Sequence, residues 1–280
     1  MSLNSIVNEE ALSANVNKVP GKVYLCQTGD ELSCGACCGL YNLPFESKNA
    51  LYAFLYKRTL LFDQVARNAD DILLFCNKEQ KRIDELGFAP VKDFHHCPYL
   101  GLMGADLDKP GCLLHPYAEK NNSVDFRGLS YYGGLACASY FCPTYYAVEP
   151  LRKLIVREVI RDWYEYGLII TEADMINNIF DFIEKELGRA FNIDDLTLEI
   201  SFHLADLFKL KLNWPYEQCL PYPVNFFFKD GELRKNPYID NSKYSAILYA
   251  VKADISTDEE LKRAEFYIEK KITALSNNLL

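Results

Sequence analysis

The chain carries ten cysteines among its 280 residues, and most of them lie close together. Nine fall between Cys26 and Cys142, and only Cys219 lies beyond. Residues 1–20 lack the basic and apolar regions of a secretory leader, so we do not expect a disulfide framework. In a reducing compartment, such a density of thiols favours metal binding or redox chemistry. We therefore expect a cytoplasmic protein with a local thiol site.

The motif CGACC, from Cys34 to Cys38, could bind a metal. In a Cys-x-x-Cys pair a turn can bring both sulfurs to one ion, and Gly35 makes that turn easier. Cys38 follows Cys37 directly, and since adjacent side chains diverge, the two seldom bind one mononuclear ion. The motif indicates two centres, two irons of one cluster, or one ligand beside a buried thiol. A thioredoxin-like redox pair would need a βαβ setting, which the sequence does not predict.

The later cysteines follow in three segments, FHHCPYLG, KPGCLLHP and GLACASYFCPT. Glycine and proline in these segments favour turns, so we expect these cysteines in loops. Eight thiols match two four-sulfur sites in number, which does not assign each ligand to a centre. The candidate ligands are Cys26, Cys34, Cys37, Cys38, Cys97, Cys112, Cys137 and Cys142.

The order of these motifs resembles that of the CxxCxxCC family of zinc- or iron-chelating proteins, whose members are often described as containing iron–sulfur clusters. The resemblance covers Cys26 to Pro143. It matches the opening motif to Cys34, Cys37 and Cys38, the Cys-Pro to Cys97, the Gly-Cys to Cys112, and the closing pair to Cys137 and Cys142. Two features depart from the family pattern. Cys26 stands eight residues before Cys34, and His115-Pro116 replaces a common Arg-Pro.

Zinc and iron–sulfur centres would give the protein different chemistry. A closed four-sulfur zinc site is redox-inert and structural, whereas an iron–sulfur cluster can carry electrons. The Cys-Pro pairs at 97–98 and 142–143 slightly favour a cluster, and nearby rings could shield it from solvent: Tyr140, Phe141, Tyr145 and Tyr146. We expect an iron–sulfur or zinc protein that could serve a protein redox partner.

Two other functions stay open. One is a structural zinc module that shapes a surface for a partner or for metal handling. The other is a metal-dependent enzyme with His96 or His115 beside an open coordination position. His95 and His96 precede Cys97 directly, and we expect His115 beside the metal ligands rather than among them.

Composition excludes other classes of function. The net charge is −9 and neither half of the chain is basic, which argues against nucleic-acid binding. No uninterrupted apolar run approaches the length of a membrane span, so we expect no membrane partner.

The pattern of apolar residues predicts a mainly α protein, with the irregular cysteine-rich part packed on a helical part. The expected regions are a flexible lead-in over 1–20, a metal-binding region over 21–148 and a helical region over 149–280. Proline, glycine and capping residues predict helices over 46–66, 150–167, 171–188 and 193–212, and another that starts at a Ser256–Glu259 capping box. Asp230-Gly231 predicts one small β-hairpin.

Overall fold

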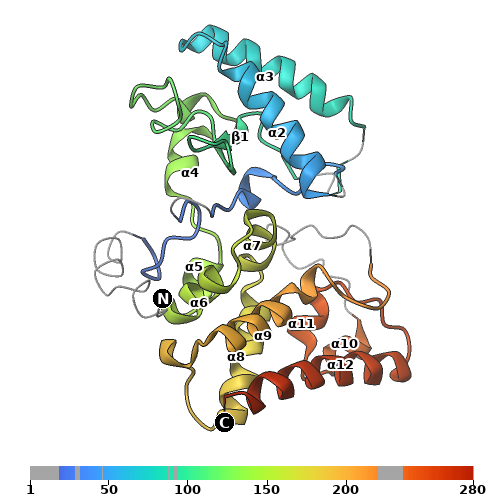
Figure 1. Ribbon diagram of the computed structural model, residues 1–280. Helices are drawn as coiled ribbons and strands as arrows, with labels where there is room; N and C mark the ends of the chain where they lie inside the picture. Colours follow the sequence, from blue (N-terminus) through green and yellow to red (C-terminus); the bar gives the residue numbers. More distant parts are fainter. Residues whose placement is uncertain are drawn as a thin grey trace. The chain divides into compact units, whose positions relative to one another are not determined.

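The computed structural model describes residues 19–28, 32–45, 47–87, 89–90, 94–219 and 236–279. It is mainly α with a small two-stranded antiparallel sheet, as the sequence predicts (Figure 1). The hairpin expected at Asp230-Gly231, and the lead-in up to residue 18, lie outside the described residues. The chain forms two compact units. One runs from Cys26 to Cys142, and the other joins the described residues up to Leu25 with those from Pro143 onward.

The Cys26–Cys142 unit, called the cysteine unit below, holds all eight candidate ligands. Its two strands pair antiparallel, with Leu100 opposite Cys112 and Met103 opposite Lys109. Its elements are η2 (Ala36–Cys38), α2 (Lys48–Phe62), α3 (Ala69–Asp84), β1 (Leu100–Met103), β2 (Lys109–Cys112), η3 (Arg127–Leu129) and α4 (Gly133–Ser139).

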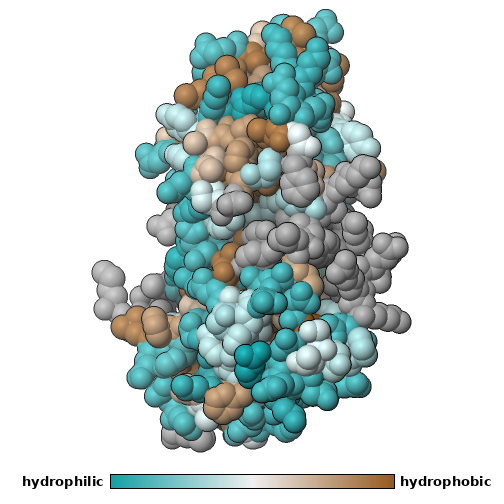
Figure 2. All heavy atoms as spheres, turned by 90° about the vertical axis from the view of Figure 1, so that its right-hand side faces the viewer, coloured by the Kyte–Doolittle hydropathy of each residue, from teal (hydrophilic) through white to brown (hydrophobic). Residues whose placement is uncertain are grey.

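Helices α2 and α3 pack against each other through aromatic rings. The Phe62 ring lies 5.0 Å from that of Phe75, and both contact the buried Tyr99. Helix α2 begins where the side chain of Ser47 accepts a hydrogen bond from the Ala50 N–H, as an N-cap does. Four leucines of the two helices are exposed instead, namely Leu60, Leu61, Leu73 and Leu74. Figure 2 shows hydrophobic residues among hydrophilic ones on this unit.

The other unit, called the helical unit below, is built around α8, which packs on α5, α6, α7, α11 and α12. The buried face of α8 is made of residues at helical spacing, among them Ile176, Ile179 and Ile183. Its elements are α5 (Thr144–Ala147), α6 (Pro150–Val159), α7 (Trp163–Ile170), α8 (Ala173–Leu187), η4 (Ile193–Asp195), α9 (Leu198–Phe208), η5 (Lys209–Lys211), α10 (Pro237–Asp240), α11 (Ser245–Ala250) and α12 (Asp258–Asn277).

Two helices expected to be continuous are interrupted. The predicted helix over 150–167 ends at Val159, and a second helix begins at Trp163, with the Asp162 side chain accepting from the N–H of Tyr164 at 2.8 Å. The predicted helix over 193–212 likewise separates into η4, α9 and η5, with Thr197 as the N-cap of α9. In both places a capping side chain starts a new helix where apolar spacing alone predicts continuation.

Two helix starts also differ from the prediction. Glu172 is the N-cap of α8, and the Thr171 hydroxyl instead donates to the Gly167 carbonyl one turn back in α7. Helix α12 starts at a Thr257–Glu260 capping box, one residue later than expected. The predicted end of α8 at Gly188 is confirmed, since Gly188 takes the left-handed conformation that glycine favours at a C-cap.

In the described parts of the chain, no helix combines the length and the apolar character needed to cross a membrane.

Candidate metal centre

The CGACC motif forms one turn of 3-10 helix. Its N–H groups close back on the motif, with Cys38 donating to Gly35 at 3.0 Å and Gly39 donating to Ala36 at 2.9 Å. Gly39 has a φ of 77°, and a Cβ there would clash with the His95 carbonyl oxygen. Only glycine permits this turn, because it tolerates both the left-handed conformation and the close approach of another chain segment.

Backbone hydrogen bonds bring distant cysteines to this turn. The Cys97 N–H donates to the Cys38 carbonyl at 2.9 Å, which places the Cys-Pro segment directly beside the motif. The Cys34 N–H donates to the Cys26 carbonyl at 2.8 Å, so the eight-residue spacing does not separate Cys26 from the motif. Cys112 joins through the sheet, where it pairs with Leu100.

Two of the later cysteines do not lie in loops as expected. Cys112 is the last residue of strand β2, and Cys137 lies inside helix α4. Cys137 is exposed, its sulfur lies 3.0 Å from the Ser130 hydroxyl oxygen, and its carbonyl accepts a long 3.5 Å hydrogen bond from Arg127. A short helix and a strand end therefore hold positions that the glycine and proline pattern predicts as turns.

The thiols influence one another in two sets. Burial raises the pKa of Cys34 well above its usual value, and the charges of Cys26, Cys37 and Cys142 raise it further. These four residues are called the first thiol group. Such charge effects require proximity, because they fall off with distance and screening. Cys26, Cys37 and Cys142 therefore each lie near the Cys34 thiol.

The remaining four candidates form the second thiol group, Cys38, Cys97, Cys112 and Cys137. Burial raises the pKa of Cys97 to about 12, and the charges of Cys112 and Cys137 add to the rise. Burial likewise raises the pKa of Cys112 to about 11, again with a contribution from Cys137. Apart from Cys97, these residues keep some exposed surface, yet enough water is withheld from the Cys112 thiol to favour its neutral form.

Cys37 and Cys38 join the two groups. The hydrogen bond between their side chains is the main influence on both, lowering the pKa of Cys37 and raising that of Cys38. The charges of Cys97 and Cys112 also raise the pKa of Cys38. The two side chains thus interact directly, so the expectation that neighbouring side chains diverge is not confirmed here.

Thiols are suitable metal ligands, but in the structure these side chains do not surround a common metal position. In the described residues, no three or more Cys, His, Asp or Glu side chains stand in an arrangement that could hold a metal ion. Thiols with raised pKa values stay protonated without an ion, and metal binding displaces those protons. Each thiol group supplies the four sulfurs that a tetrathiolate zinc site or a cubane cluster uses. Ligation would require the side chains to move together.

Arg58 donates hydrogen bonds to the backbone that carries part of the second thiol group. It is fully buried on α2, where its Nε donates to the Glu79 carboxylate at 2.7 Å. Its Nη1 donates to the carbonyl oxygens of Leu100 at 2.8 Å and Cys97 at 3.3 Å. The same Nη1 lies 2.8 Å from Nε2 of His96. One buried guanidinium therefore ties a helix to the backbone that carries Cys97.

Both ring nitrogens of His96 form hydrogen bonds in this network. Its Nε2 accepts from Arg58, and its Nδ1 donates to the Gly39 carbonyl at 2.7 Å, next to Cys38. Burial and the Arg58 cation lower the pKa of His96 well below its usual value, so the ring is neutral. Both ring nitrogens are hydrogen-bonded in the structure, and the hypothesis that His96 lies beside an open coordination position stays a prediction. The His96 ring braces the Gly39 turn.

His115 and the aromatic rings near the cysteines match the sequence-based expectation only in part. His115 accepts from the Tyr117 N–H through its Nδ1, and its place beside the ligands stays a prediction. Tyr145 is buried in the helical unit, where its hydroxyl accepts from Leu25. Instead Tyr132 lies by the second thiol group, since burial and the charges of Cys38 and Cys97 raise its pKa to about 12.

Arg58 and Tyr132 are the main residues that the sequence reasoning missed. Arg58 lies three residues after Leu55 and four before Phe62, in the middle of the buried face of α2. A charged residue at such a position is a signal, because arginine is almost never fully buried without a partner. Tyr132 has no comparable signal in its local sequence.

Comparisons with family models, curated proteins and solved structures found no match to this chain, so the resemblance to the CxxCxxCC family stays a prediction.

Proposed function

We propose that this protein binds metal through the two thiol groups, with iron–sulfur clusters as the favoured cargo. The carrying observation is geometric: backbone hydrogen bonds bring Cys26 and Cys97 to the Cys34–Cys38 turn, and Cys112 joins through the strand pair. The influence of these thiols on one another's pKa values agrees with this proximity. Four thiolates are the number that either a zinc ion or a cubane cluster requires.

Positive charge beside the second thiol group supports the proposal. The Arg58 cation lowers the pKa of Cys97, and the Arg127 cation lowers that of Cys112, although burial outweighs both effects. Thiolate ligands carry negative charge into a buried site, which is costly without compensation. Both guanidiniums are already paired with a carboxylate, Arg58 with Glu79 and Arg127 with Asp125, so they offset only a small part of that charge when the thiols lose their protons to a metal.

The arrangement suits a centre that stores or passes electrons. When bound, an iron–sulfur cluster would supply redox chemistry, tuned by burial and by nearby hydrogen-bond donors. The chain's own part is to hold the sulfurs, exclude water and keep a side open to a partner. Cys137 is the most exposed of the second group and marks that side. We place this activity in a reducing compartment such as the cytoplasm.

A structural zinc module is the second candidate, and the all-sulfur donor sets favour it. Closed four-sulfur zinc sites are structural and need no histidine. The enzyme with an open position next to His96 is less favoured, because both nitrogens of that ring already form hydrogen bonds.

Metal analysis of anaerobically purified protein tests the proposal. We expect iron together with acid-labile sulfide and a brown chromophore, and neither should survive in a variant lacking Cys34, Cys37 and Cys38. The conservative control is Cys76→Ser, because Cys76 lies on α3 outside both thiol groups. Zinc without sulfide or colour would replace the cluster by a structural role. Full native reactivity of all ten thiols without any metal would overturn the proposal.

A further inference from the structure

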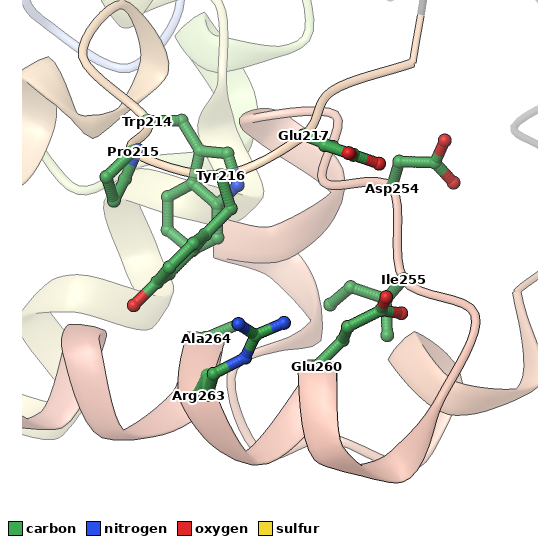
Figure 3. Close-up of a pocket in the computed structure, with 9 residues that line it drawn as sticks. All are labelled: Trp214, Pro215, Tyr216, Glu217, Asp254, Ile255, Glu260, Arg263 and Ala264. Atoms are coloured by element: carbon green, nitrogen blue, oxygen red, sulfur yellow. The ribbon is translucent and has the colours of Figure 1, made fainter.

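A cavity of about 420 Å³ lies in the helical unit, in a part of the chain without the clustered cysteines. One wall is the segment from Trp214 to Glu217, and the other is formed by Asp254, Ile255 and the first turns of α12 (Figure 3). The walls are tied by backbone hydrogen bonds, since the Asp254 N–H donates to the Glu217 carbonyl at 3.0 Å. A short bridge between Gln218 and Ala253 extends this tie. The cavity is thus held by backbone rather than by side chains alone.

The indole N–H of Trp214 has no hydrogen-bond partner among the residues that the structure describes. Trp214 is only 7% exposed, and its Nε1 is buried. Figure 3 shows this nitrogen on the side of the ring that faces the space between Glu217 and Arg263. An unsatisfied buried donor is costly, so most such groups in proteins find a partner. The cavity therefore presents a donor that requires an acceptor from a ligand or from water.

Aromatic rings line the same side. The Tyr216 ring lies 5.4 Å from that of Trp214 and nearly perpendicular to it, and both contact Tyr267 of α12. The guanidinium of Arg263 lies 5.9 Å from the centre of the Tyr216 ring. Rings held edge to face form a rigid apolar surface, which loses little entropy when a flat or branched group packs on it.

Three ionised groups at the cavity are left for a ligand. Among the described residues, Arg263, Glu217 and Asp254 have no ion-pair partner. Figure 3 shows Arg263 on α12, with the carboxylates of Glu217 and Asp254 nearer the top of the view. The carboxylate of Glu260 is already used, because it accepts from the N–H groups of Ser256 and Thr257 as the capping box of α12.

We propose that this cavity binds a free α-amino acid with a large apolar or aromatic side chain. Its carboxylate accepts hydrogen bonds from Arg263 and from the Trp214 indole, and its ammonium lies by Glu217 and Asp254. Its side chain packs against Tyr216 and Ile255. A simple organic cation satisfies the carboxylates but leaves the indole donor unpaired, and a simple acid leaves the two carboxylates without a cation. A zwitterion pairs with the donors at one end of the cavity and with the carboxylates at the other.

Calorimetric titration of the full chain with L-phenylalanine tests this binding. We expect saturable binding, and we expect phenethylamine and 3-phenylpropionate, which each lack one charged group, to bind at least ~10-fold more weakly. The variant Arg263→Gln should weaken phenylalanine binding by about the same factor while leaving the weak binding of phenethylamine unchanged. Lys262→Gln is the matched control, because Lys262 is exposed on the same helix and does not line the cavity.

A second variant separates binding from folding. Trp214→Phe keeps a ring but removes the N–H, so it should weaken phenylalanine binding several-fold, with the amine again unaffected. Circular dichroism on each variant shows whether the helical unit is intact. Absence of phenylalanine binding up to about 10 mM, weaker than almost any specific site, overturns the inference. Equal binding of phenethylamine, or full affinity in the Arg263→Gln variant, overturns it as well.

Discussion

Arg58 shows how one side chain can determine the shape of a site that it does not enter. It connects α2 to the backbone of Cys97 and Leu100 and, through His96, to the Gly39 turn. The Arg58–Glu79 pair is buried, so its stability depends on both partners being present. The cysteines supply the metal donors, and Arg58 holds in place the backbone segment that carries Cys97.

Replacing Arg58 by methionine should destabilise the cysteine unit by about 3 kcal/mol or more. The substitution leaves the Glu79 carboxylate buried without its main partner and leaves the carbonyl of Leu100 without its donor. Urea unfolding measures the loss. The control is Arg82→Met, since Arg82 also contacts Glu79 but is partly exposed, so it should cost about 1 kcal/mol or less. Equal losses in the two variants would show that Arg58 has no special role.

Lys252 makes the stability of the helical unit depend on pH. Its burial, with the Lys211 cation nearby, lowers its pKa to about 6, although Glu172 acts in the opposite direction. A lysine whose pKa is lowered on folding binds more protons in the unfolded chain between its folded and unfolded pKa values. The free energy of unfolding should therefore rise as the pH increases from about 6 toward 10.

The variant Lys252→Met should remove that rise and increase stability at pH 7. Chemical denaturation at several pH values between 6 and 9.5 provides the measurement. The comparison is Lys270→Met, because Lys270 is exposed on α12 and its removal should leave the slope unchanged. A slope that persists in the Lys252 variant would assign the pH dependence to other groups.

At the scale of elements, the ends of helices carry information that apolar spacing does not. The residues from Leu151 to Gly167 keep a helical spacing of apolar positions, yet the chain breaks at Ile160, which is buried as the C-cap of α6. Asp162 then caps α7, and Gly167 lies inside that helix instead of ending it. Tertiary packing thus overrides the local preference of glycine for a helix end.

Asp162→Ala should therefore destabilise the helical unit by about 1 kcal/mol. The substitution leaves the N–H groups of Tyr164 and Glu165 without their acceptor at the first turn of α7. Thermal or urea unfolding gives the value, and Asp162→Asn is the control because it keeps the side-chain oxygen. If α6 and α7 were one continuous helix in solution, alanine would be neutral or stabilising at this position.

The parts of the site that depend on local interactions could be predicted from the sequence, and the parts that depend on long-range contacts could not. The Cys34–Cys37 turn is local, and glycine and spacing predict it well. The partition of thiols into two groups depends on contacts such as Cys38 with Cys97 and Cys26 with Cys34, which only the folded chain brings about. The glycines near Cys112 and Cys137 predict loops, but glycine also fits the tight strand pair and the short helix that the structure has there.

At the scale of the whole molecule, the eight candidate ligands lie within one continuous segment of the chain. That segment, Cys26–Cys142, has its own helices and one small sheet, and some of the thiols lie within these elements and others in the segments between them. The helical unit has its own apolar core around α8. Metal binding and the stability of the helical unit should therefore be separable.

Removal of metal should change the two units differently. Treating the purified protein with a chelator should raise amide hydrogen exchange through Cys26–Cys142, because metal-ligand bonds there contribute to folding. Amides in α8 and α12 should keep their protection. Mass-spectrometric exchange before and after chelation makes the comparison, and the double variant Cys34→Ser/Cys97→Ser should resemble the chelated state from the start. Uniform loss of protection across both units would contradict this division.

The most direct test of the account counts metal centres in variants of each thiol group. Native mass spectrometry of anaerobically prepared protein should find two centres in the unaltered chain. It should find one centre after Cys26→Ser/Cys142→Ser and one after Cys97→Ser/Cys112→Ser, because each double variant removes half the donors of a single group. An unaltered chain without metal, or a double variant that keeps the full metal content, would contradict two separate metal centres.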